Sequence, residues 1–161
     1  MAAGKGTRMK SALPKVLHRL AGRSLLQHVL DTAAQLGADR IVAITGHGAE
    51  RVESSVNAPG LVFVRQEPQL GTGHAVLQAV PQLHADGTTL ILNGDVPLVR
   101  AETLEHLVKA AGDGLAICTS DLTDARDYGR VVRDARKRVR RIVEHKDASA
   151  KELRIHEWYA G

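Results

Sequence analysis

Cysteine, aromatic residues and long apolar runs are all scarce in this sequence of 161 residues. The single cysteine, Cys118, excludes a disulfide within the chain, and its apolar neighbours favour a buried structural thiol. No run of about 18 apolar residues occurs, so no membrane-spanning helix is predicted. The first eight residues also lack the apolar region of a signal peptide. Together these absences predict a cytoplasmic protein that has no membrane partner.

Aromatic side chains are limited to one phenylalanine, one tryptophan and two tyrosines. Nucleic-acid bases would find few rings to stack on, so binding of single strands is disfavoured. The formal net charge of +4 is compatible with anionic partners but does not identify one. A cluster of basic residues between Arg133 and Arg141 is most simply a solvated face of a hairpin. We therefore predict no nucleic-acid partner.

Apolar stretches of strand length alternate with amphipathic stretches of helix length, which predicts an α/β fold with helices covering a mostly parallel sheet. The predicted strands cover residues 40–45, 61–65, 88–93 and 114–120. The predicted helices run from the N-cap Ser24 to Gly37 and over residues 48–56, 73–83 and 101–111. Residues 129–133 and 139–144 are predicted to form a hairpin, which makes the sheet mixed. Because no linker or repeat is visible, one domain covering residues 1–161 is predicted.

Near its start the chain has the glycine-rich and then basic sequence Ala-Ala-Gly-Lys-Gly-Thr-Arg-Met, residues 2–9. Glycines let backbone amides approach an anion closely, and Lys5 and Arg8 add charge, so the segment is interpreted as a phosphate-binding loop. Its spelling fits neither the P-loop nor the dinucleotide fingerprint. An ordinary turn is the alternative. Lys15 follows a proline that stiffens the chain, and it could clamp a phosphate or lie free on the surface.

Two further segments follow predicted strands. Residues 66–75, Gln-Glu-Pro-Gln-Leu-Gly-Thr-Gly-His-Ala, open a helix, and Gln66 or Thr72 could bind a base or a sugar there. A lone histidine at a helix start, here His74, more commonly has a structural role. Asp95, in Asn-Gly-Asp-Val-Pro-Leu, lies at the carboxyl end of a predicted strand, where an aspartate could hold Mg²⁺ against a triphosphate. A turn-forming aspartate is the alternative.

These segments, in this order, closely resemble the bacterial bifunctional N-acetylglucosamine-1-phosphate uridyltransferase / glucosamine-1-phosphate acetyltransferase family. The resemblance also covers Tyr-Gly-Arg at 128–130 and Ile-Val-Glu-His-Lys-Asp-Ala at 142–148, and thus nearly the whole chain. It implies a Rossmann-like nucleotidyltransferase domain that converts UTP and N-acetylglucosamine 1-phosphate to UDP-N-acetylglucosamine and pyrophosphate. That product serves cell-wall peptidoglycan and lipopolysaccharide synthesis.

The resemblance also implies roles for single residues. Arg8 and Lys15 would neutralise phosphates, and Asp95 would bind Mg²⁺. The uridine nucleotide would contact a set of mostly small residues: Ala2, Ala3, Gly4, Gln66, Gly71 and Thr72. The sugar would contact Gly129, Glu144 and Tyr159. Tyr159 stands where an asparagine is common in the family, and Asn93 stands where tyrosine is common.

The segment at residues 2–9 would normally follow a buried strand, and the chain stops within another predicted strand. We therefore expect a partial nucleotidyltransferase domain, without its first strand and its C-terminal part. The resemblance places a second metal ligand after Gly161. It places there as well the left-handed β-helix that acetylates glucosamine 1-phosphate and builds a homotrimer, so we expect no acyltransferase domain in residues 1–161.

Two alternatives stay open at this stage. One is a nucleotidyltransferase of other specificity, using CTP or a hexose 1-phosphate, and the segment from Gln69 to Ala75 argues against it. The other is a nucleotide-binding module without catalytic activity. A nicotinamide-dependent dehydrogenase is disfavoured because Met9 stands where the dinucleotide fingerprint requires glycine or alanine.

Overall fold

The structure, a computed structural model, describes residues 1–6, 9–125 and 127–160. The chain forms two compact units, Met1–Lys109 and Ala110–Gly161. The boundary between them falls in the last turn of helix α4 (Ala101–Ala111). No glycine-rich or proline-rich linker marks a boundary inside a helix, and for that reason the sequence pattern suggested none.

The first unit is built around the parallel strands β3 (Ile41–Thr45) and β4 (Leu61–Arg65), which pair from Ile41 with Leu61 to Thr45 with Arg65. The other elements of this unit are the short hairpin β1 (Arg19–Leu20) and β2 (Arg23–Ser24), helices α1 (Leu25–Gln35), α2 (Ala49–Glu53), α3 (Thr72–Ala79) and α4, and the 3₁₀ turns η2 (Lys15–Leu17) and η3 (Val80–Gln82). The predicted strands at 40–45 and 61–65 and the parallel sheet are thus confirmed.

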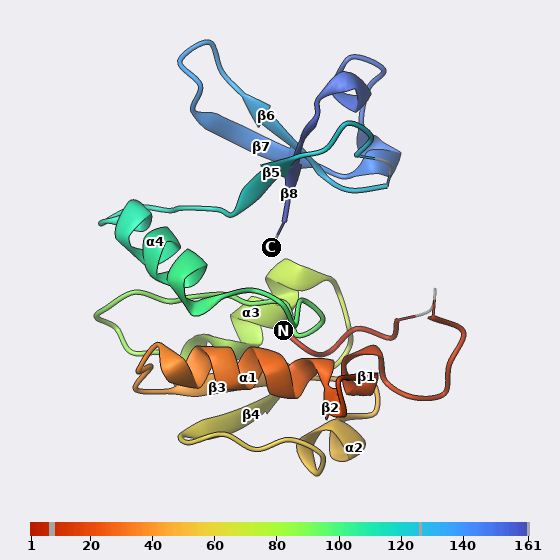
Figure 1. The fold of residues 1–161 in the computed structure, drawn as a ribbon, viewed down its shortest axis with the longest axis vertical. Coiled ribbons are helices and arrows are strands. Elements are labelled where there is room, and N and C mark those ends of the chain that lie inside the picture. The colour runs from red at the N-terminus through yellow and green to blue at the C-terminus, as the bar shows by residue number, and fades with distance from the viewer. Residues whose placement is uncertain (7–8, 126, 161) are drawn as a thin grey trace. The chain divides into compact units, whose positions relative to one another are not determined.

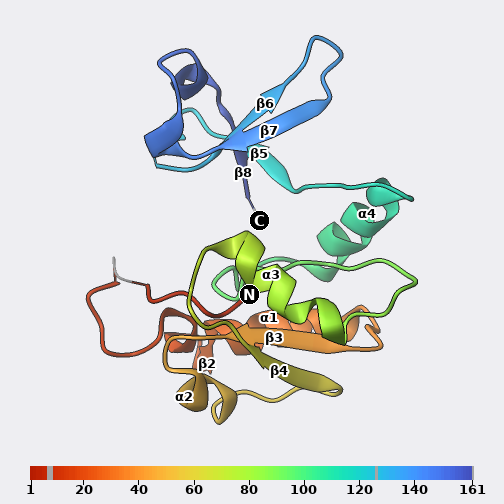
Figure 2. The same ribbon diagram turned by 180° about the vertical axis from the view of Figure 1, so that it is seen from behind.

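Helices α1 and α3 cover opposite faces of the β3–β4 pair (Figures 1 and 2). Successive side chains of a strand point to opposite faces, and β3 follows this rule. Ile41 belongs to a core cluster with Leu26 and Leu30 of α1, whereas Ile44 packs in a second cluster with Ala75 of α3. A strand that is apolar on both sides therefore lies between two helical layers, as the α/β prediction required.

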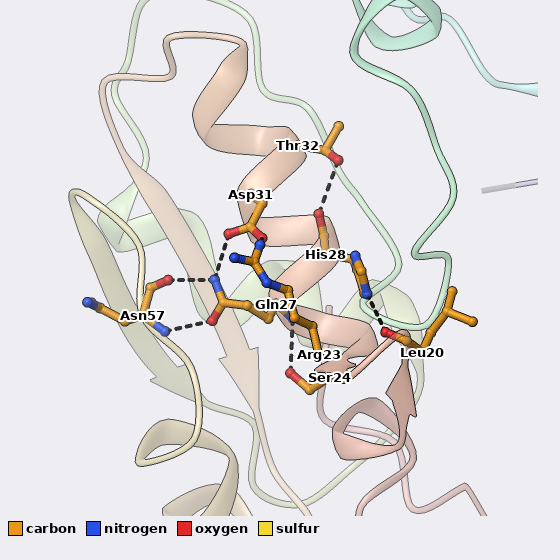
Figure 3. A network of polar contacts seen from close by, with 8 residues as sticks. All are labelled: Leu20, Arg23, Ser24, Gln27, His28, Asp31, Thr32 and Asn57. Carbon is orange, nitrogen blue, oxygen red and sulfur yellow. Dashed lines mark hydrogen bonds and ion pairs between the residues drawn. The ribbon is translucent and has the colours of Figure 1, made fainter.

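The start of α1 is held by a network of polar contacts (Figure 3). The Ser24 side chain accepts a hydrogen bond from the Gln27 backbone N–H at 3.2 Å, which makes Ser24 the N-cap, as predicted. Gln27 Nε2 donates to Asp31 and to the Asn57 carbonyl, both at 2.8 Å. Gly37, with φ of +68°, follows the helix end as predicted. The network ties α1 to the loop that follows α2.

The second unit has a four-stranded antiparallel sheet in the order β5-β8-β6-β7. These strands are β5 (Thr119–Asp121), β6 (Arg130–Arg133), β7 (Val139–Val143) and β8 (Glu157–Tyr159), accompanied by the 3₁₀ turns η4 (His145–Asp147) and η5 (Glu152–Arg154). β6 and β7 form the predicted hairpin. Arg133, Arg138 and Arg141 make ion pairs with Glu157, Asp134 and Glu152, so part of the basic cluster is neutralised locally.

Ser149 and Glu152 exchange hydrogen bonds in the pattern of a capping box, across the turn that leads into η5. Bonds from the Ser149 hydroxyl and backbone N–H, followed by Arg141, lower the pKa of Glu152 to about 2. The carboxylate therefore stays ionised and ties η5 to β7 through Arg141.

Other predicted elements differ from the structure. Residues 88–93 form no strand. Met1 bonds to the Leu92 carbonyl and to the Gly94 N–H, but these two bonds do not make a ladder. Of residues 114–120, only the last two are in a strand, β5. The predicted helix over 48–56 is shorter, and the one over 73–83 becomes a 3₁₀ turn from Val80, next to Pro81. Helix 101–111 is confirmed at both ends.

Candidate functional site

The first three residues lie between the end of β3 and Gly94. Ala2 N–H donates to the Ile44 carbonyl at 2.7 Å, and Gly94 N–H donates to the Met1 carbonyl at 2.8 Å. His47 N–H in turn donates to the Ala3 carbonyl at 3.2 Å. Ala2 and Ala3 are buried. The predicted nucleotide loop thus begins at the carboxyl end of a parallel strand, where ligands bind in open α/β sheets.

Two glycines allow the surrounding loops to pack closely. Gly6 has φ of +59°, and a Cβ there would lie 2.7 Å from Lys15 Cβ. At Gly46 a Cβ would lie 2.9 Å from both Ala3 Cβ and Gln69 Nε2. A side chain at either position would push apart the segments that carry predicted site residues.

Lys15 and Asp95 form an ion pair. Pro14 is the N-cap of η2, and Lys15 is the first residue of that turn. Asp95 follows the buried Gly94, whose backbone is bonded to Met1. The two side chains are 38% and 30% exposed, so solvent and an incoming ligand can reach both. The structure thus brings together the predicted phosphate-binding lysine and the predicted metal-binding aspartate.

Gln66 lies directly after β4, and only 3% of the residue is exposed. Its backbone N–H donates to the Thr45 carbonyl at 2.8 Å. Its side-chain Nε2 lies 2.9 Å from the Gly71 carbonyl and 3.1 Å from His74 Nδ1. Gly71, with φ of +99°, is the N-cap of α3, and the exposed Thr72 begins the helix. Gln66 is therefore bonded to Gly71, and Thr72 follows directly at the start of α3.

The three predicted sugar-binding residues meet in the second unit. Tyr159 N–H donates to the Gly129 carbonyl at 3.1 Å. A Cβ at Gly129 would lie 3.7 Å from Glu144 Oε1, so this glycine leaves room beside the carboxylate. Burial raises the pKa of Tyr159, and the phenol stays neutral at physiological pH. Together they supply a carboxylate acceptor and a hydroxyl, both suited to sugar hydroxyls.

Of the predicted site residues, Arg8 lies outside the described residues. Gly4 is exposed, as Gly71 and Thr72 are. For a metal, Asp95 offers a hard oxygen ligand, and no cluster of three or more metal-binding side chains occurs among the residues that the structure describes. This donor set fits Mg²⁺, which commonly takes one or two carboxylates together with phosphate oxygens and waters.

An apolar cavity of about 340 Å³ lies between α1, β3 and residues 88–92. Ala2 and Gly94 line it, but Lys15, Gln66 and Asp95 do not. Since a triphosphate needs charged and polar partners, this cavity is not the predicted nucleotide site. In the described part of the chain no helix has the length and apolar character to cross a membrane.

Two residues near the predicted site were not predicted from the sequence. Gly46 and His47, between β3 and α2, pack against or bond to Ala3. The Gly-x-Gly pattern directly after a predicted strand was the signal available for them. His74 was interpreted as structural. In the structure its ring lies against the carboxamide of Gln66, which is predicted to bind the nucleotide.

A Rossmann-like α/β fold with small residues, a lysine and an aspartate gathered near the strand ends is the arrangement expected of a nucleotidyltransferase. The chain belongs to the MobA-like NTP transferase domain family, whose model matches residues 1–157. That match covers both compact units. The α/β nucleotidyltransferase fold predicted from the sequence is therefore confirmed.

Curated relatives indicate a particular member of this class. The chain is 62% identical to the Bifunctional protein GlmU of Methylibium petroleiphilum and 56% identical to that of Ralstonia nicotianae. Both matches cover 100% of this chain but only 37% and 36% of the relative. The chain thus spans little more than a third of these relatives. Their bifunctional name agrees with the family that the motifs resemble.

Solved structures show the same fold at lower identity. An apo UDP-glucose pyrophosphorylase has a TM-score of 0.70 and 17% identity, and the match covers 99% of this chain and 72% of that one. HddC from Yersinia pseudotuberculosis, complexed with GMP-PN, has a TM-score of 0.69 and 23% identity, covering 89% of this chain and 66% of that one.

Proposed function

We propose that this chain carries the uridylyl-transfer activity of a bifunctional enzyme. UTP and N-acetylglucosamine 1-phosphate are the proposed substrates, and UDP-N-acetylglucosamine and pyrophosphate are the products. The chain would form part of one nucleotidyltransferase domain. The homotrimeric assembly and the cytoplasmic location stay predictions.

The observation that carries the proposal is the continuous set of contacts around the strand ends. Ala3 packs at Gly46, Gly6 packs against Lys15, and Lys15 pairs with Asp95. The predicted anion loop, a lysine and an aspartate are thus neighbours in the structure. This set of groups suits a nucleoside triphosphate, and the Gln66 loop adds polar groups for a base.

For this reaction the protein needs mainly to position the two substrates and to offset their negative charge. A phosphate oxygen of the sugar phosphate attacks the α-phosphorus of UTP, the bond from that phosphorus to the bridging oxygen breaks, and pyrophosphate leaves with the electron pair. No protein nucleophile is needed, but two anions must be held in line and their charge offset. Lys15 and Arg8 would offset phosphate charge. Mg²⁺, held by Asp95, would supply further positive charge to the triphosphate.

The test is pyrophosphate release from UTP, with Mg²⁺ and N-acetylglucosamine 1-phosphate. It compares this chain with a hybrid that is extended at both ends by the flanking residues of the Methylibium petroleiphilum relative. We expect turnover that falls at least about a hundredfold in Asp95→Ala, as for loss of a group that stabilises transferring phosphates. Asp113→Ala, which removes an exposed carboxylate, should keep full activity.

The alternatives predict different results in the same assay. Preferential turnover of CTP, GTP or dTTP, or of a hexose 1-phosphate, would support a nucleotidyltransferase of other specificity. A folded hybrid that binds UTP but releases no pyrophosphate would support a noncatalytic nucleotide-binding module instead.

A further inference from the structure

Gln66 has a side chain that could serve a ligand in two opposite ways. A carboxamide presents an acceptor oxygen on one side and a donor NH₂ on the other, and a half-turn exchanges the two. A free glutamine therefore does not distinguish a donor on a base from an acceptor. Selection between the two requires partners that hold the carboxamide in one direction.

The structure contains those partners. A carbonyl oxygen only accepts, so the Gly71 carbonyl, 2.9 Å away, requires Gln66 to present its NH₂. That carbonyl also accepts from the Ala75 backbone N–H at 3.1 Å, which fixes its direction. The second N–H of the Gln66 NH₂ points to His74 Nδ1 at 3.1 Å. Both donors of the carboxamide are therefore occupied.

The contact with Gln66 also fixes the state of the His74 ring. Nδ1 must carry a lone pair to accept, so the ring proton lies on Nε2. His74 Nε2 lies 3.2 Å from Gln78 Nε2, one turn further along α3, and the same Gln78 NH₂ donates to the His74 carbonyl at 3.3 Å. Turning the Gln78 carboxamide over would give the Nε2 proton an acceptor oxygen in exchange for that second contact. The Gln66 oxygen, by contrast, accepts no hydrogen bond from the residues that the structure describes.

We propose that His74 is a positioning residue that turns the Gln66 carboxamide oxygen toward the base and so selects uracil over cytosine. This inference rests on the proposed function, in which Gln66 receives the base. Uracil presents an N–H at ring position 3, which the oxygen accepts, whereas cytosine presents a lone pair there and would face the oxygen with repulsion. Turning the carboxamide over for cytosine would set its oxygen against the Gly71 carbonyl and His74 Nδ1.

The test compares UTP and CTP affinities, measured by calorimetry on the whole chain with Mg²⁺ present. His74→Leu removes the acceptor and should reduce the preference for UTP about tenfold, the effect of one hydrogen bond of ordinary strength. His74→Asn places an amide oxygen near the position of Nδ1 and should restore much of the preference. His106→Leu, on the exposed face of α4, is the matched control.

The outcomes separate this inference from the proposed function. If the parent chain prefers UTP and His74→Leu weakens UTP and CTP alike, His74 has only a structural role and the inference is wrong. A parent that binds both nucleotides equally also overturns it, while nucleotide binding itself stands. A parent that binds neither nucleotide contradicts the proposed function as well.

A second measurement does not depend on a ligand. Nitrogen-15 chemical shifts of the His74 ring report which nitrogen carries the proton, and we expect it on Nε2 at neutral pH. A proton on Nδ1 would leave no acceptor for Gln66 and would contradict the proposed orientation.

Discussion

Lys15 and Asp95 form an ion pair, although each is predicted to bind a different part of the substrate complex. A divalent cation that binds Asp95, as predicted, would compete with the ammonium group for the carboxylate. A triphosphate that draws Lys15 away leaves the carboxylate free for the metal. If both predictions hold, the pair would couple the two binding events, because each ligand would remove a competitor of the other.

We predict opposite effects of Lys15→Met on two affinities. Without nucleotide, Mn²⁺ should bind about twofold to fivefold more tightly, the range set by an exposed ion pair that no longer competes. With Mn²⁺ present, UTP should bind more weakly, because a phosphate contact is lost. Electron paramagnetic resonance of free Mn²⁺ and UTP calorimetry measure the two effects.

The matched control for Lys15→Met is Lys109→Met, which removes an exposed lysine on α4. It should change neither affinity. Unchanged or weaker Mn²⁺ binding in Lys15→Met would show that Lys15 does not compete for Asp95.

Elements with strong local signals could be predicted from the sequence. Helices 25–35 and 101–111 have a cap or a clear apolar stripe, and β3 and β4 are short apolar runs of the right length. Residues 88–93 are also a short apolar run, like β3 and β4. A strand needs a pairing partner as well, and the local sequence does not encode that partner. The close approach of Ala3 to Gly46 could likewise not be predicted, because it depends on the path of a segment distant in the sequence.

At the element scale, Gly46 controls how closely the loop after β3 approaches the first residues. We predict that Gly46→Ala destabilises the fold by about 1 to 3 kcal/mol, the usual range for overpacking. The new Cβ would lie 3.0 Å from the Ala3 carbonyl, which is backbone and cannot move away freely. Urea unfolding followed by circular dichroism measures the loss.

Gly4→Ala is the matched control for Gly46→Ala, because a Cβ at Gly4 meets no atom within 4 Å and its φ is not positive. Its stability should stay within about 0.5 kcal/mol of the parent. Equal stabilities of the two variants would mean that the loops relax and that the contact at Gly46 does not hold the site together.

At the scale of the whole molecule, the predicted contacts divide between the two compact units. The described residues predicted to contact nucleotide or metal lie in residues 1–109, and Gly129, Glu144 and Tyr159 lie in residues 110–161. The motifs and their order predict this set of residues, and their contacts with substrate stay predictions. They did not reveal that Gln66 is held by His74, or that Lys15 pairs with Asp95, because such contacts exist only after the chain folds.

Because the predicted nucleotide and sugar contacts lie in different units, a substitution in one unit should affect the binding of only one substrate. Glu144→Gln keeps the size of the side chain but removes the charged acceptor, so it should raise KM for N-acetylglucosamine 1-phosphate about tenfold or more in the extended hybrid. UTP affinity of the chain should not change, because its predicted contacts lie in the other unit. Glu105→Gln, an exposed change on α4, should alter neither quantity. A loss of UTP affinity as large as the rise in KM would show that Glu144 serves the nucleotide, and the assignment of the two units would then be wrong.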